Sequence, residues 1–267
     1  MTSALAADNM PPQQMMDALD EVATSCAHRG VKIIVDAESQ HFQRQIDTVA
    51  IELMRKYNRE GFAAIYNTYQ AYLKSTPSNI ANHLSEASKD NFTLGLKVVR
   101  GAYILSENRA LIHNTKSDTD DAYNSIAQGA VKRQFDRFGG SGPESLPFPS
   151  VDLFLASHNR ESLVQALRLH RQMTRAEKPT VPIAFGQLHG MSDELSFSLI
   201  QDGLDGDPTP DVFKCSTWGS MGECLAYLLR RATENRDAVL RTLDEHDAVK
   251  QECWRRWKSM FSAQTSS

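Results

Sequence analysis

The chain has 267 residues, of which 41% are hydrophobic, so it can bury one large core or two small ones. Its net charge is −4 with both signs mixed along the sequence, which gives no electrostatic basis for binding nucleic acid. No stretch approaches the roughly 20 apolar residues of a membrane-spanning helix. The four cysteines lack the CxxC spacing of metal ligands, so we expect free thiols and no metal site.

Residues 1–14 contain proline and glutamine but no arginine. They resemble neither a secretory signal nor an arginine-rich transit peptide, so we expect no targeting peptide in this chain.

From residue 14 to residue 235, short β-rich runs alternate with amphipathic stretches of helical length. The pattern predicts strands at 31–36, 63–69, 96–101, 151–157, 182–185 and 211–215, and helices at 14–28, 43–59, 79–90, 118–138, 160–175, 192–201 and 220–235. Apolar strands separated by helices are typical of a parallel sheet buried on both faces. We therefore expect one α/β domain over residues 1–262, with 236–261 as a helical tail and 263–267 disordered.

Polar residues gather where the predicted strands end, which is where a parallel α/β barrel carries its chemistry. The segments are DAE (36–38), NTYQ (67–70), KVVRGAY (97–103), SHN (157–159), GQLHG (186–190) and CSTWG (215–219). Each has a simpler explanation when taken singly: Asp36 as a helix cap, Asn67 as a turn residue, His158 as a packing residue, and Lys97 and Arg100 as solvated charges. Six polar strand ends together favour a site.

The predicted helix at 220–235 carries two stripes with helical spacing. One stripe is apolar and is expected to be buried: Leu225, Leu228, Leu229 and Ala232. The other lies about 200° round the helix and is polar: Tyr227, Arg230, Arg231 and Glu234. A pair of arginines in fixed geometry is a good bidentate receptor for a carboxylate. The alternative is a solvated helix face with an internal Arg–Glu pair.

The polar set contains no hydrolytic motif such as GxSxG, no cysteine placed beside a histidine, and no two-histidine metal spacing. It is rich in amide, hydroxyl and cationic donors, which suit an anionic, ring-bearing cofactor better than a metal.

Six segments in chain order resemble the eukaryotic proline dehydrogenase (proline oxidase) family. They are VDAE, YNTYQAYLK, LKVVRGAY, LASHN, FGQLHGM and WGSMGECLAYLLRRATEN, and the resemblance runs from about residue 31 to residue 235. The resemblance implies a distorted (βα)8 barrel with FAD at the carboxyl ends of its strands. It also implies oxidation of L-proline to Δ1-pyrroline-5-carboxylate, with hydride passing to flavin N5 and electrons passing on to ubiquinone.

The resemblance implies the roles of the substrate site. Arg230 and Arg231 would bind the proline carboxylate, Asp36 would orient an arginine, and Glu234 would hold an arginine by an ion pair. The residues packed on the pyrrolidine ring would be Tyr103, Leu188 and Tyr227.

The flavin contacts implied by the resemblance are Asn67, Lys97, Val99, Ala102, Ser157, His158, Asn159, Gln187 and Arg231. Lys97 would be the cation near flavin N5, where positive charge stabilises the reduced flavin. A mitochondrial location on the matrix face, with peripheral association with the inner membrane, is a further implication of the resemblance. The oligomeric state is left open.

Two departures from the family pattern bear on activity. The family's first barrel strand, which brings an active-site lysine, has no counterpart here, and Cys215 and Thr217 stand where the family has tyrosine and proline. We therefore expect an incomplete barrel with an open sheet edge, weak FAD binding and slow turnover. A rival hypothesis is a truncated or non-catalytic paralogue that binds a ligand or a partner. Flavin binding by the purified chain would separate the two.

Overall fold

The computed structural model describes residues 11–201, 209–234 and 239–262. The chain divides into two compact units, Met1–Gly186 and Gln187–Ser267. The disorder predicted for 263–267 and the absence of a targeting peptide expected in 1–14 fall wholly or largely outside the described ranges. That residues 1–262 form a single domain stays a prediction.

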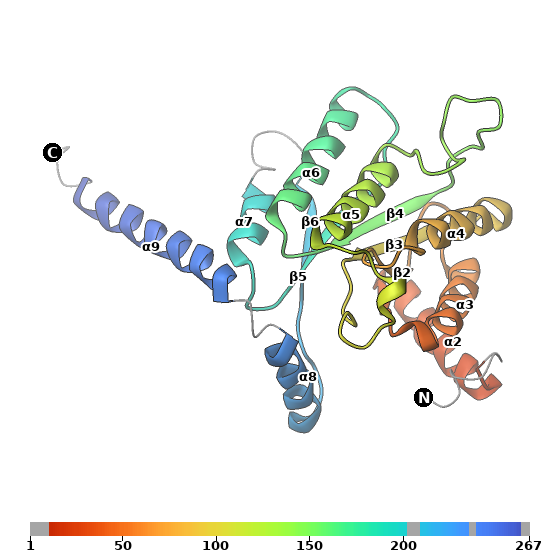
Figure 1. Ribbon diagram of the computed structural model, residues 1–267, viewed down its shortest axis with the longest axis horizontal. Helices are drawn as coiled ribbons and strands as arrows, with labels where there is room; N and C mark the ends of the chain where they lie inside the picture. The colour runs from red at the N-terminus through yellow and green to blue at the C-terminus, as the bar shows by residue number, and fades with distance from the viewer. Residues whose placement is uncertain (1–10, 202–208, 235–238, 263–267) are drawn as a thin grey trace. The chain divides into compact units, whose positions relative to one another are not determined.

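Six strands form one sheet in the order β1-β2-β3-β4-β5-β6, and the pairings from β1 to β5 are parallel (Figure 1). The strands are β1 (Ile33–Val35), β2 (Ile65–Gln70), β3 (Leu94–Val99), β4 (Val151–Ala156), β5 (Ile183–Leu188) and β6 (Asp211–Cys215). Strands and helices alternate along the chain as they do in a (βα)8 barrel, with some strands missing. The predicted incomplete barrel is therefore confirmed.

The first unit also contains α2 (Gln13–His28), α3 (Gln40–Tyr57), α4 (Thr76–Asp90), η1 (Arg109–Leu111), α5 (Lys116–Val131) and α6 (Arg160–Arg175). Local signals set several of their ends. Helix α5 begins with a capping box between Thr115 and Asp118. Helix α4 begins three residues before the predicted start because Pro77 occupies its first turn, where a missing N–H costs nothing.

The helix predicted at 118–138 ends at Val131, so its last two turns or so were wrong. Arg133 and Asp136 adopt positive φ angles of 54° and 49°, which an α-helix cannot contain.

The core of the first unit lies between the sheet and helices α3 to α6. Every residue of β2 is buried, and Ile65, Leu94 and Leu153 are each 0% exposed. Successive side chains of a strand point to opposite faces, so each strand has a helix face, packed against the helices, and an inner face. This alternation decides which side chains reach the site.

The second unit holds the end of β5, then β6, α7 (Asp193–Gln201), α8 (Met221–Glu234) and α9 (Val239–Ser262). Lys214 on β6 forms a 2.7 Å ion pair with Asp193 on α7. The predicted helical tail is confirmed as α9, where Trp254 and Trp257 pack edge to face with their centroids 5.0 Å apart.

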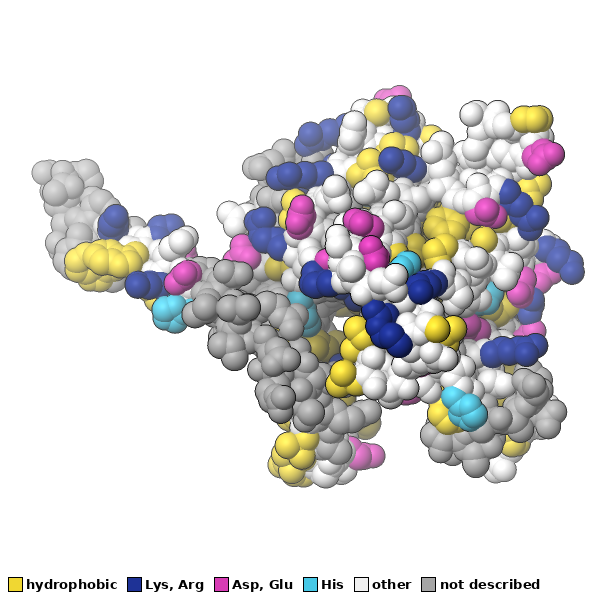
Figure 2. Space-filling model, viewed as in Figure 1, with side chains coloured by type: hydrophobic (Ala, Val, Ile, Leu, Met, Phe, Trp, Pro, Cys, Tyr) yellow, Lys and Arg dark blue, Asp and Glu magenta, His cyan; other side chains and the backbone are white. Residues whose placement is uncertain are grey.

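On the face shown in Figure 2, cationic and anionic side chains are interspersed and do not gather into one patch. None of the helices in the described ranges combines the length and apolarity needed to cross a bilayer.

Candidate active site

An ion pair joins two strand ends on the inner face. Lys97 lies on β3 in register with Thr68 of β2 and Phe154 of β4, so the three side chains share a face. Its ammonium lies 2.5 Å from the carboxylate of Asp36, which directly follows β1. The Lys97 side chain is only 14% exposed, whereas that of Asp36 is 77% exposed. Sequence reasoning assigned Asp36 to an arginine; in this structure it pairs with Lys97.

Gln70, the last residue of β2, joins the two loops that carry the predicted substrate residues. Its amide nitrogen donates to the backbone oxygen of Glu38, and its amide oxygen accepts from the backbone N–H of Ala102. The Tyr103 hydroxyl donates to the Glu38 carboxylate at 2.5 Å. The loop after β1 and the loop after β3 are therefore held together above the inner face. Gln70 is 3% exposed, and the sequence analysis did not single it out.

Arg100, which directly follows β3, forms three side-chain hydrogen bonds at these strand ends. Its guanidinium donates to Asp120 at 2.6 Å, to Ser157 at 2.6 Å and to Ser162 at 2.9 Å. Burial raises the pKa of Asp120, but hydrogen bonds from Lys116 and Arg100 outweigh that effect and hold it below its usual value. Arg100 therefore anchors Ser157, the first residue of the predicted flavin segment 157–159.

The structure turns the side chains of three predicted flavin contacts toward the helices: that of Ser157, which bonds Arg100, and those of two amides. Asn67 is fully buried and donates to Asp47 of α3 at 2.7 Å, on the face of β2 opposite to Gln70. The amide oxygen of Gln187 accepts from Ser196 of α7 at 2.8 Å. In this structure neither amide lies on the inner face with Lys97.

Helix α8 carries the predicted substrate clamp. The Arg231 guanidinium carbon lies 5.5 Å from the centroid of the Tyr227 ring, so these two members of the polar stripe do share a side of the helix. The side chains of Arg230 and Glu234 lie outside the described atoms. The expected burial of the apolar stripe was wrong for the members that can be seen, because Leu225, Leu228 and Leu229 are 50%, 52% and 67% exposed.

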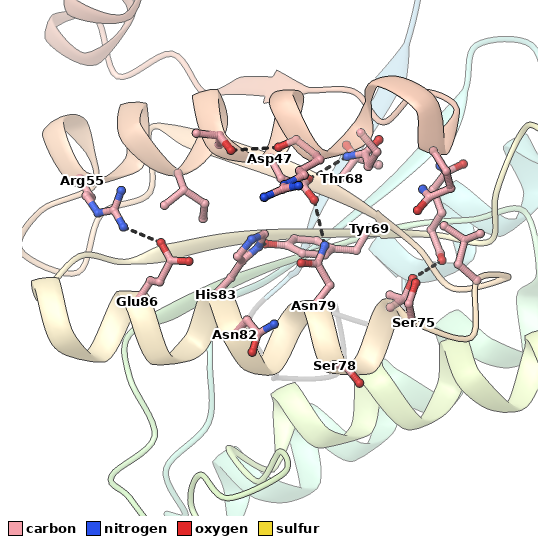
Figure 3. A pocket seen from close by; sticks show the side chains of 18 residues that line it. Asp47, Arg55, Thr68, Tyr69, Ser75, Ser78, Asn79, Asn82, His83 and Glu86 are labelled. Atoms are coloured by element: carbon pink, nitrogen blue, oxygen red, sulfur yellow. Dashed lines mark hydrogen bonds and ion pairs between the residues drawn. The ribbon is translucent and has the colours of Figure 1, made fainter. Parts of the chain in front are cut away.

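A polar groove of about 560 Å³ lies between α3 and α4, away from the inner face (Figure 3). At its floor the Asp47 carboxylate accepts from the side-chain amides of Gln43, Asn67 and Asn79 at 2.7 to 2.9 Å. The Tyr69 hydroxyl and His83 Nδ1 lie 2.7 Å apart. None of the predicted substrate residues lines this groove, so its size does not make it the reaction site.

The remaining predicted residues of the first unit lie at the carboxyl ends of β3 and β4. Val99 ends β3 in register with Gln70, Ala102 and Tyr103 follow in the next loop, and His158 and Asn159 follow β4. Leu188 ends β5 in the second unit and is partly buried. The described residues contain no cluster of three metal-ligating side chains.

The donors at these strand ends suit a flavin. A largely buried ammonium on the inner face of the sheet provides positive charge where a reduced flavin needs it. The residues that would hold the flavin are Lys97, Val99, Ala102, Ser157, His158 and Asn159.

Comparison with known proteins gives the family. The sequence profile described as proline dehydrogenase matches residues 3–242. "Proline dehydrogenase 1, mitochondrial" of Caenorhabditis elegans is 34% identical over 252 residues, which are 92% of this chain and 39% of that protein. The Dictyostelium discoideum protein of the same name is 36% identical over 238 residues, 85% of this chain and 38% of that protein. "Hydroxyproline dehydrogenase" of Homo sapiens is 31% identical over 257 residues, 94% of this chain and 53% of that protein.

The chain therefore spans between about two fifths and about half of the length of these relatives. Among solved structures, proline utilization A from Bdellovibrio bacteriovorus, inactivated by N-propargylglycine, superposes with a TM-score of 0.65. The match covers 84% of this chain and 22% of that one at 21% identity, which supports the barrel fold alone.

Proposed function

This chain belongs to the proline dehydrogenase family, and on that premise we propose that it oxidises L-proline to Δ1-pyrroline-5-carboxylate with FAD. The observation that carries the proposal is the Lys97–Asp36 pair on the inner face, beneath the two loops joined by Gln70. It combines a positioned cation with a substrate-side loop on one face of the sheet.

Each residue has a defined task in this proposal. Arg230 and Arg231 hold the substrate carboxylate, and Glu234 keeps an arginine in place by an ion pair. Tyr103, Leu188 and Tyr227 pack on the pyrrolidine ring and exclude water from it. Fixed orientation is the largest contribution that such a site makes to a transfer within one complex. The hydrogen bond from Tyr103 to Glu38 supports this role because it fixes the phenol ring.

Lys97 places its positive charge beside the flavin ring, and Asp36 keeps that ammonium in position. Ser157, His158, Asn159, Val99 and Ala102 contact the cofactor from the neighbouring strand ends. When bound, FAD would supply the acceptor for the hydride of the ring carbon next to nitrogen, and ubiquinone would be the final acceptor of the electrons. Mitochondrial placement, on the matrix face of the inner membrane, is part of the same proposal because the relatives are named mitochondrial.

Hydroxyproline is a second candidate substrate, because the human relative is named a hydroxyproline dehydrogenase. The two substrates differ by one hydroxyl, so a pocket residue that bonds this hydroxyl would decide between them.

Reduction of bound flavin tests the proposal. The full chain is loaded with FAD and mixed anaerobically with L-proline, D-proline or hydroxyproline while the visible absorption of the flavin is followed. We expect L-proline to bleach the flavin and D-proline to leave it unchanged. Faster bleaching by hydroxyproline would favour the second substrate. Bound flavin that no substrate bleaches would support the non-catalytic paralogue, and failure to bind added FAD would overturn the proposal.

A further inference from the structure

Arg100 lies outside the set of residues to which the family resemblance gives a role, yet it holds one of the predicted flavin segments. Three of its bonds reach three different elements: the end of β4 at Ser157, the first turn of α6 at Ser162, and α5 at Asp120. Its guanidinium carbon also lies 4.4 Å from the centroid of the Tyr123 ring. The side chain is only 22% exposed.

The bonds of Arg100 close the turn between β4 and α6 from both ends. The Ser157 hydroxyl that accepts from Arg100 also accepts from the backbone N–H of Asn159 at 3.0 Å. Asn159 in turn caps α6, because its side-chain oxygen accepts from the backbone N–H of Ser162. The second guanidinium bond reaches the Ser162 hydroxyl, so one planar group spans the whole turn.

We propose that Arg100 is a positioning residue that holds the Ser157–His158–Asn159 turn in the form that binds the flavin. The inference rests on the proposed function, since it takes these three residues as flavin contacts. Arg100 lies on the helix face and acts through Ser157, so it is not itself a contact to the cofactor. A guanidinium is needed because a lysine ammonium cannot donate to Asp120, Ser157 and Ser162 in one plane.

Arg55 provides a matched control. It also lies in the first unit, is 29% exposed, and binds three acidic side chains: Glu52, Glu86 and Asp90. These belong to α3 and α4, and none of them belongs to a predicted flavin segment. Loss of Arg55 therefore removes a comparable ionic cluster without touching the turn.

The experiment compares Arg100→Met, Arg100→Lys and Arg55→Met in the full chain by FAD titration and by hydrogen exchange of segment 157–162. We expect Arg100→Met to weaken FAD binding about tenfold and to speed exchange in that segment, and Arg100→Lys to recover only part of the loss. Arg55→Met should bind FAD like the unchanged protein and exchange normally at 157–162.

Equal FAD affinity in Arg100→Met and Arg55→Met, with the unchanged chain binding FAD, would overturn the inference and leave the proposed function standing. Full recovery by Arg100→Lys would also overturn it, because a point charge would then be sufficient. If the unchanged chain binds no FAD, the proposed function fails, and the assignment of Arg100 to the flavin falls with it. Global unfolding of Arg100→Met would appear as fast exchange throughout the first unit. The inference would then be tested by the FAD affinity of Arg100→Lys, which should lie below that of the unchanged chain.

Discussion

The strand ends that carry Lys97 and the groove between α3 and α4 are both lined by polar side chains, but their hydrogen bonds run in different directions. In the groove, the Asp47 carboxylate accepts hydrogen bonds from three side-chain amides, and the Tyr69 hydroxyl lies against His83, so these polar groups bond mainly to one another (Figure 3). At the strand ends, bonds such as those of Gln70 join loops and leave Lys97 and Asp36 at a sheet face. The comparison teaches that a large polar cavity can serve stability, whereas a site needs charged groups that face open space.

The largest expected effect lies in the groove. Asp47→Ala leaves three amide donors without their acceptor, two of them buried and that of Asn79 half-buried, so we expect the free energy of unfolding to fall by about 3 kcal/mol. FAD affinity should stay within about twofold of the unchanged value, because none of the residues assigned to the flavin at the strand ends lines the groove. Denaturant titration and FAD titration measure the two quantities. The control is Asn82→Ala, which changes an exposed residue of the same groove. Lower stability of this control, or a large loss of FAD affinity in Asp47→Ala, would contradict the comparison.

The second effect concerns the clamp on α8. Under the proposed function, Arg231→Met would remove a charge-assisted contact to the substrate carboxylate, which costs about 1.5–3 kcal/mol, or roughly ten- to a hundredfold in use of proline. FAD retention should change far less. The measurements are kcat/KM for proline and the affinity for FAD, each compared with that of the unchanged protein. Arg255→Met, which changes an exposed arginine in the same unit, is the control. Equal losses of flavin and substrate binding would assign Arg231 to the cofactor.

A smaller effect is expected at the strand end itself. Lys97→Met would remove the cation that we propose lies beside the flavin, so flavin reduction at saturating proline should slow about tenfold, which corresponds to about 1.4 kcal/mol. Lys97→Arg keeps the charge and should retain most of the rate. Anaerobic stopped-flow absorption follows the reaction. Unchanged reduction in Lys97→Met would show that the Lys97–Asp36 pair is only structural.

The sequence predicts those features that depend on local pattern. Helix α6 spans the predicted residues 160–175, and Lys97 and Asp36 meet at the strand ends, as parallel strands require. The choice between Asn67 and Gln70 could not be made in this way. Both are amides of β2, Asn67 in the middle of the strand and Gln70 at its end, and the face that each one occupies depends on the register of the strand with its neighbours.

The exposed apolar stripe of α8 illustrates a second limit. Spacing shows that Leu225, Leu228 and Leu229 share a face, but what covers a face depends on tertiary structure and is not encoded in spacing. The role of Arg100 was hidden for a related reason. Its three partners lie 20 to 62 positions away along the chain, so only the fold brings them together.

The smallest effect is a pH dependence that arises in the groove. Burial lowers the pKa of His83, against the opposing influence of Asp47 and Glu86, so the folded protein keeps this imidazole neutral where an unfolded chain would protonate it. Because the unfolded state binds the additional proton, stability is complete above about pH 6.5 and falls as the pH drops below that value. One proton limits the slope to about 1.4 kcal/mol per pH unit.

His83→Gln keeps an acceptor for the Tyr69 hydroxyl but cannot titrate, so its unfolding free energy between pH 7 and pH 5 should fall less steeply. His41→Gln, at an exposed position of α3, is the control. Identical slopes for His83→Gln and the unchanged protein would show that some other group causes the acid sensitivity, and FAD affinity should not follow the same curve if the groove serves stability alone.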